Sequence, residues 1–206
     1  MKKALLLAII AILAVFSLSC GKPNVGDPDE VAVVETNYGR FVIEFLPNDA
    51  PLHVANFKQL ARQGFFDSTK IHRLVKDKAN TPVAIQGGDP NTISGDSATW
   101  GQGQPSQKTV SAEFSKTLKH IRGIVSAARR GNDDNSHTSQ FFVCVAPEPQ
   151  WDGRYSIFGR VIEGMNVVDS ISRAPVWKDT DRPLDPVVVS RIYIAKRGEV
   201  AAGHSE

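Results

Sequence analysis

Short apolar runs separated by Gly- and Pro-rich turns are the feature that most constrains the fold of this 206-residue chain. Roughly eight of these runs have the length and composition of β-strands. Apolar residues at helical spacing occur in two segments, 51–64 and 165–171. Many short strands with few helices predict a mainly β (all-β class) domain, built as a closed barrel or a sandwich.

The first helical segment has start and stop signals in the sequence. Asp49 is the predicted N-cap, because an Asp side chain accepts hydrogen bonds from the free N–H groups at a helix start. Pro51 suits the first turn, and Gly64 ends the helix because glycine readily adopts a positive φ.

The stretch Ile71 to Pro90 carries the first candidate functional residues. Side chains alternate along a strand, so His72 and Arg73 point to opposite faces. Gln86 ends the next strand, before a glycine pair that permits a tight turn or a close backbone approach. Arg73 is permanently charged, and the strand around it contains no acidic residue. A lone Arg is usually a surface charge, but one held on a strand can serve as a fixed catalytic donor.

Further motifs follow in a fixed order along the chain. With His72-Arg73, the motifs are Gln86-Gly87-Gly88-Asp89-Pro90, Ser139-Gln140-Phe141-Phe142-Val143, and Asp152-Gly153-Arg154-Tyr155 with Phe158-Gly159-Arg160-Val161. Together they resemble the cyclophilin family of peptidyl-prolyl cis–trans isomerases, over residues from about Val31 to about Ala195. The resemblance implies a closed eight-stranded antiparallel barrel with a helix at each end, as one domain over residues 31–196. It also implies isomerase activity without a cofactor, on proline-containing unfolded or extended polypeptides.

The resemblance also implies roles for single residues. Arg73 is the donor to the proline nitrogen, and Gln86 hydrogen-bonds the substrate backbone. Phe142 forms the floor of the proline pocket. Ala128, with the backbone of Arg129 beside it, binds the preceding residue as an extended strand.

Several residues depart from the family pattern. Val83 and Ala84 stand where the family has Phe and a larger aliphatic residue, which predicts a wider and less aromatic pocket. Gln150 stands at the position of the aromatic that contacts cyclosporin. Trp151 follows it in a position that is normally Leu, and can take either role. Tyr155 replaces a His that is common in eukaryotic members.

These departures predict weaker drug binding and leave a second function open. The alternative is a catalytically weak module that binds proline-containing peptides, favoured by Val83 and Ala84. The enzyme is favoured by Arg73 and Gln86. A Ser-His-Asp hydrolase has little support, because no Gly-x-Ser-x-Gly elbow is present and no base pairs with Ser139.

The N-terminus is a targeting segment. Lys2 and Lys3 precede an uncharged apolar run that is typical of a secretory signal peptide, over residues 1–19, and is short for a membrane span. Cys20 follows the run directly. This arrangement resembles the lipobox of bacterial lipoproteins, although Ser17 stands where an aliphatic residue is usual.

We therefore predict that Cys20 is lipidated and anchors the protein in the cell envelope, at the outer membrane and periplasm or at the cell surface. An ordinary signal peptide and an uncleaved anchor are the alternatives. Residues 20–30 form the lipidated Cys and a linker, and residues 197–206 form a flexible tail.

Charge and cysteine content exclude further classes of function. Without residues 1–19 the chain has 22 basic residues, because Lys2 and Lys3 are lost from the 24, and 22 acidic residues. A neutral chain lacks the basic face that nucleic-acid binding requires, so we expect no nucleic-acid partner. Cys144 lies in a buried-strand pattern, which predicts an inert core thiol. We expect a monomer without a metal site.

Overall fold

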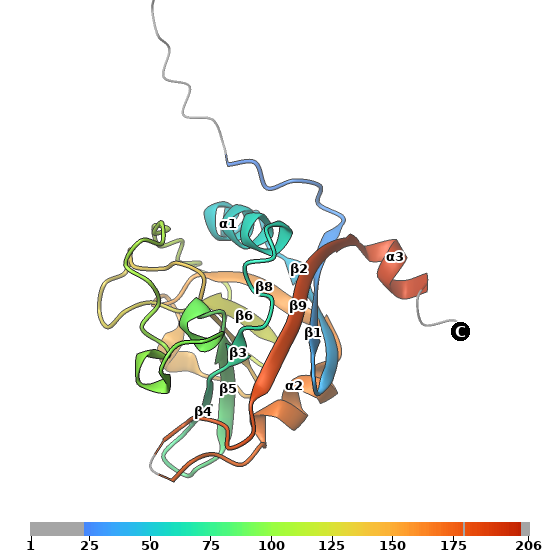
Figure 1. The fold of residues 1–206 in the computed structure, drawn as a ribbon. Helices are drawn as coiled ribbons and strands as arrows, with labels where there is room; N and C mark the ends of the chain where they lie inside the picture. The colour runs from blue at the N-terminus through green and yellow to red at the C-terminus, as the bar shows by residue number, and fades with distance from the viewer. Residues whose placement is uncertain (1–22, 179, 203–206) are drawn as a thin grey trace, which may run out of the picture.

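The computed structural model describes residues 23–178 and 180–202 (Figure 1). Nine strands form one sheet in the order β3-β9-β1-β2-β8-β6-β7-β5-β4. The strands are β1 (Glu30–Thr36), β2 (Gly39–Phe45), β3 (Lys70–Ile71), β4 (Arg73–Lys76), β5 (Pro82–Gly87), β6 (Ile124–Ala127), β7 (Phe141–Cys144), β8 (Ile157–Glu163) and β9 (Val187–Lys196). The helices are α1 (Pro51–Arg62), α2 (Met165–Ser172), α3 (Arg197–Ala202) and the short 3₁₀ turns η1 (Pro90–Thr92), η2 (Ser97–Thr99) and η3 (Pro149–Trp151).

The mainly β class is confirmed, but the prediction of a closed barrel of eight strands is wrong. The sheet has nine strands, and its ladder is open, with β3 and β4 at the two ends. These edge strands are separated in sequence only by His72, whose N–H donates to the carbonyl of Gln86 at 3.0 Å. The strand expected from Ile71 to Val75 is therefore split, because its first part pairs with β9 and its second with β5.

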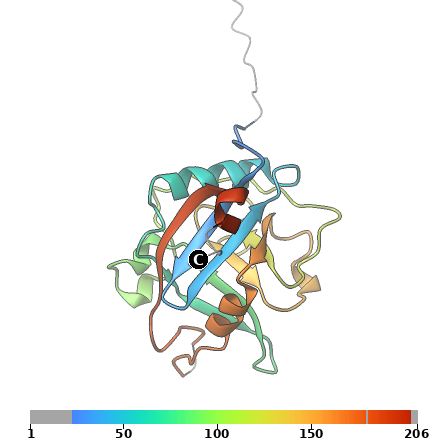
Figure 2. The same ribbon diagram turned by 90° about the vertical axis from the view of Figure 1, so that its right-hand side faces the viewer.

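A helix lies over each end of the curled sheet, as the resemblance implies: α1 at one end and α2 at the other (Figures 1 and 2). Phe57 of α1 enters the core, where its ring stacks on Phe66 with centroids 4.9 Å apart and lies edge-on to Phe141 at 5.4 Å. Full burial of one such side chain stabilises the fold by about 1.5–3 kcal/mol. The aromatic cluster therefore fixes α1 on the sheet.

The predicted cap of α1 is wrong. Ala50 occupies the N-cap position and makes no side-chain cap bond, although Pro51 does begin the helix. The carboxylate of Glu113 accepts the N–H groups of Leu52 at 2.9 Å and of His53 at 3.0 Å. A residue from a distant loop thus replaces the local cap.

The glycine pair at the end of β5 serves a close backbone approach, as predicted. A Cβ on Gly88 would lie 2.6 Å from the carbonyl oxygen of Ser139, and Gly88 has φ +85°. Both facts exclude a larger residue without local rearrangement. The pair therefore lets the strand carrying Gln86 meet the segment that leads into β7.

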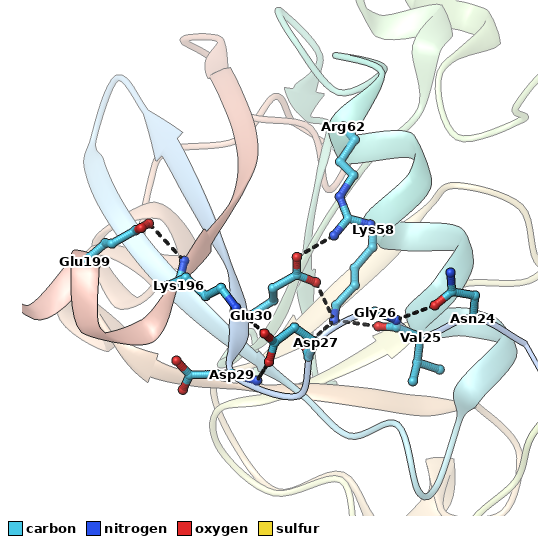
Figure 3. Close-up of polar contacts among 10 residues, drawn as sticks. All are labelled: Asn24, Val25, Gly26, Asp27, Asp29, Glu30, Lys58, Arg62, Lys196 and Glu199. Atoms are coloured by element: carbon cyan, nitrogen blue, oxygen red, sulfur yellow. Dashed lines mark hydrogen bonds and ion pairs between the residues drawn. The ribbon is translucent and has the colours of Figure 1, made fainter.

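Both flanking segments are more ordered than a linker and a loose tail. Figure 3 shows the ammonium group of the buried Lys58 bonded to the carbonyls of Val25 at 2.7 Å and Asp27 at 3.1 Å. It also pairs with the Glu30 carboxylate at 3.0 Å. Residues 25–30 are therefore fixed against α1.

At the other terminus, the prediction of a flexible tail is wrong for the residues that the structure describes. Arg197–Ala202 form α3, and Val200 is buried in a cluster with Val31, Val33 and Val42. The predicted signal peptide and Cys20 lie outside the described residues. Among the described helices, none is long and apolar enough to cross a bilayer.

Candidate active site

A cavity of about 870 Å³ lies over the strands β4, β5 and β7. Seven residues predicted from the sequence line it together. These are Arg73, Gln86, Ala128, Arg129, Phe142, Trp151 and Tyr155. The sequence motifs thus converge on one hollow, although Arg73 and Tyr155 lie 82 residues apart.

The floor of the cavity is aromatic. Phe142 of β7 lies edge-on to Trp151, with centroids 5.0 Å apart, and to Tyr155 at 5.3 Å. Trp151, and not Gln150, therefore supplies the second large ring. Three such rings form an apolar surface of the kind that holds a proline ring.

A buried polar chain supports this floor from below. The imidazole of His120 stacks on Phe142 with centroids 6.0 Å apart. Its Nδ1 lies 3.1 Å from the Asp152 carboxylate, and its Nε2 lies 3.0 Å from the Ser126 hydroxyl. Burial lowers the pKa of His120, although Asp152 opposes this shift. A neutral ring held at both nitrogens fixes the orientation of the floor.

These three residues have the connectivity of a hydrolase triad, but they cannot act as one. Ser126 is fully buried, and His120 is 1% exposed. No substrate carbonyl can reach the Ser126 hydroxyl beneath Phe142. His120 is a site residue that the motifs do not indicate; its one signal in the sequence is the buried-strand pattern that follows it.

Arg73 and Gln86 face each other across β4 and β5 in the same register pair. The Gln86 amide nitrogen donates to the Gln140 side-chain oxygen at 3.0 Å, and the Gln140 amide nitrogen donates to the Gly101 carbonyl at 3.0 Å. This chain fixes Gln86 with its own carbonyl oxygen left to accept a substrate N–H. The geometry suits the backbone-binding role predicted for Gln86.

Arg73 pairs with an acidic residue, although none lies near it in the sequence. The guanidinium Nε donates to the Asp181 carboxylate at 2.9 Å. Asp181 lies 108 residues further along the chain, so the residues around β4 gave no signal of it. Thr180 and Arg182 line the cavity beside it, and neither was predicted.

Val83 and Ala84 do not line this cavity. Ala84 is fully buried and packs in one apolar cluster with Phe142. Val83 is 4% exposed and borders a separate hollow with Gln150. Of the residues near this position, Val75 lines the cavity, whereas Val83 and Ala84 do not.

Arg129 lines the wall next to Ala128. Its guanidinium lies over the Tyr155 ring at 5.1 Å and pairs with Asp134 at 3.2 Å. The neighbouring Trp100 belongs to the long polar loop after β5 and also borders the cavity. The second cysteine of the chain, Cys144, is buried behind this site, and burial raises the pKa of its thiol to about 12.

An open aromatic hollow with an ion-paired Arg and a hydrogen-bonded Gln suits the binding of a proline-containing segment. The family described as cyclophilin type peptidyl-prolyl cis-trans isomerase/CLD matches residues 31–194. The chain belongs to this family and is a peptidyl-prolyl cis–trans isomerase.

Relatives from several eukaryotes are similar over most of their length. Peptidyl-prolyl cis-trans isomerase-like 1 of Neurospora crassa is 37% identical, over 82% of this chain and 96% of the relative. Peptidyl-prolyl cis-trans isomerase CYP18-2 of Arabidopsis thaliana is 38% identical, over 82% and 95%. A crystal structure of a Cryptosporidium parvum cyclophilin in the presence of the dipeptide Ala-Pro has a TM-score of 0.69 and 29% identity, over 81% of this chain and 99% of that one.

Proposed function

We propose that this isomerase accelerates Xaa-Pro rotation in exported polypeptides while a lipid on Cys20 anchors it in the cell envelope. The observation that carries the catalytic part is the convergence of Arg73, Gln86 and Phe142 on one cavity. The apolar run before Cys20 supports the envelope part. The segment 25–30, which is fixed on α1, then starts the folded domain close to the anchor.

The geometry suits catalysis of a rotation that breaks no bond. Amide resonance makes this rotation cost about 18–20 kcal/mol, and the twisted amide has a basic nitrogen. The Arg73 guanidinium can donate to that nitrogen, while the ring of the proline rests on Phe142 and the Gln86 carbonyl holds the backbone. Since the Arg73 donor is in place before rotation, it favours the transition state over the planar substrate.

Substrates in this proposal are extended, proline-containing segments of unfolded chains, bound by a monomeric enzyme. The Ala-Pro dipeptide present with the Cryptosporidium cyclophilin supports this class of ligand. The residue before the proline would lie along Ala128 and Arg129, which form one wall of the cavity. An open cavity of this size does not require a folded partner.

The catalytic part is tested by NMR exchange on an Ala-Xaa-Pro peptide, with the chain lacking residues 1–20. We expect the wild type to accelerate exchange and Arg73→Ala to lose at least about tenfold, because one charged donor in a transition state contributes about that much or more. Peptide binding without acceleration would contradict the proposed role of Arg73.

The envelope part is tested separately in a bacterial host. The full chain and Cys20→Ala are expressed with a radiolabelled fatty acid, and the membrane fraction is assayed. We expect label and membrane association in the wild type alone, since the thiol is the only lipid acceptor in the proposal. Label on Cys20→Ala, or a soluble wild type, would refute the anchor and leave the isomerase activity unaffected.

A further inference from the structure

The side chain of Arg73, the proposed catalytic donor, is not held in one orientation by its own strand. Its side chain is 51% exposed, and a long flexible side chain loses substantial rotamer entropy when it is held in one orientation. Gln86 lies opposite Arg73, but its amide is bonded to Gln140 and not to the guanidinium. Neighbours on the sheet therefore do not fix the donor.

Asp181 fixes it from outside the sheet. The carboxylate of Asp181 accepts the Arg73 Nε–H at 2.9 Å, and its backbone carbonyl accepts the N–H of Leu74 at 2.7 Å. The second bond ties Asp181 to the main chain next to Arg73. The distance between the two charged groups is therefore set by the backbone as well as by the side chains.

Residues 174–178 and 180–186, which we call the anchor loop, place Asp181 without help from Arg73. The N–H of Trp177 donates to the Arg182 carbonyl at 2.9 Å, and the N–H of Leu184 donates to the Pro175 carbonyl at 2.8 Å. The Arg182 guanidinium also lies over the Trp100 ring at 5.7 Å. The loop is thus closed on itself and on the far wall of the cavity.

The bond to Asp181 uses one nitrogen of the Arg73 guanidinium and leaves the other two for a ligand. Asp181 occupies Nε, and within the described residues the two terminal nitrogens donate to no other group. A guanidinium is a rigid planar fork, so fixing Nε also fixes the direction of the terminal donors. These are the donors that a substrate amide can use.

We propose that Asp181 is a positioning residue for catalysis: it holds Arg73 by Nε so that the terminal nitrogens face the substrate amide. The proposal rests on the isomerase activity of the chain. It makes the anchor loop, which lies outside the sheet, part of the catalytic apparatus. The bond to Arg73 acts on the transition state, whereas the aromatic floor holds the substrate in both states.

The test compares Asp181→Asn, Asp181→Glu and the matched control Asp185→Asn, all without residues 1–20. Asp185 lies on the same loop, is exposed, and loses the same charge when replaced. The turnover number and KM are measured separately by NMR exchange at several concentrations of an uncharged Ala-Xaa-Pro peptide. We expect Asp181→Asn to lower kcat about fivefold with KM changed less than about twofold, the size typical of a half-exposed ion pair.

Two further measurements separate a positioning role from a merely structural one: the kcat of Asp181→Glu and the dependence of kcat on salt. Asp181→Glu keeps the carboxylate and should recover part of kcat. Between about 0.05 and 1 M salt, the wild-type kcat should fall toward that of Asp181→Asn, because salt screens exposed charges. Asp181→Asn should stay flat, and Asp185→Asn should follow the wild type.

Wild-type kcat in Asp181→Asn, or faster turnover, would overturn the proposal, as would an equal loss in Asp185→Asn or a loss confined to KM. If Asp181→Asn does not fold, the salt series on the wild type decides the question alone: a flat kcat refutes the positioning role. The kcat of Arg73→Ala tests whether Arg73 is catalytic at all. An Arg73→Ala variant with wild-type kcat would refute the proposed active site, whereas an Asp181→Asn variant with wild-type kcat would refute only the positioning role of Asp181.

Discussion

Two ion pairs in this molecule join segments far apart in the sequence, but they differ in burial. In the pair between α1 and β1, the side chains are 3% exposed for Lys58 and 17% exposed for Glu30 (Figure 3). In the pair at the cavity, they are 51% exposed for Arg73 and 38% exposed for Asp181. The same chemistry therefore acts in two different dielectric environments.

The difference predicts different consequences when a partner is lost. A buried charge without its partner keeps the full cost of its lost hydration, so the folded state is destabilised. An exposed charge is solvated by water instead, and the fold loses little. What the exposed pair controls is the direction of the guanidinium, and this affects the rate and not the stability.

The largest expected effect tests the buried pair. Lys58→Met should lower the free energy of unfolding by about 3–5 kcal/mol, because the Glu30 carboxylate loses its buried cation and keeps only the half-exposed Arg62. It also removes the hydrogen bonds to Val25 and Asp27 that fix the start of the domain. Urea unfolding at neutral pH measures the loss, and the folded fraction should retain its kcat.

Arg62→Met is the matched control for Lys58→Met. Arg62 bonds the same carboxylate at 2.6 Å, but its side chain is 49% exposed, close to the exposure of Arg73. Its loss should cost about 0–1 kcal/mol. Equal losses in the two variants would show that burial does not separate the two classes of ion pair.

The sequence was sufficient wherever a function depends on residues within one strand or one motif. Strands with Arg73, Gln86 and Phe142 were all predicted, although not the break at His72, because alternation and glycine placement are local properties. Their convergence came from the family resemblance. Trp151 could be placed beside the floor because its motif is adjacent to Tyr155.

Contacts between distant loops could not be predicted. Glu113 caps α1 in place of Asp49, and Asp181 bonds Arg73, because tertiary packing brings loops to groups that the local sequence leaves free. A strand pattern also does not say whether a curled sheet closes its ladder. The break at His72 depends on a change of partner strand that no local residue announces.

The smaller stability effect concerns a third case, a buried ionisable group without a charged partner. His137 is fully buried, packs edge-on to His53 at 4.8 Å, and has both ring nitrogens without a hydrogen-bond partner among the described residues. Burial is the main cause that lowers its pKa to about 4, and the nearby His53 and Arg129 add to the shift. The unfolded chain therefore binds a proton here at a pH where the folded chain does not.

The sign of the pH dependence follows from this difference. The contribution of His137 to stability is fully present above about pH 6.5 and is lost as pH falls toward 4, by up to roughly 3 kcal/mol. His137→Gln should flatten the urea-unfolding profile between pH 6.5 and 4.5 by about 2 kcal/mol, the part of that amount that falls in this pH range. His72 and His120, whose pKa values burial also lowers, remain in both proteins, so their contributions cancel in the difference. Identical slopes would mean that the pKa of His137 is the same in the folded and unfolded states. Burial without a charged partner would then not be sufficient to make the free energy of unfolding depend on pH.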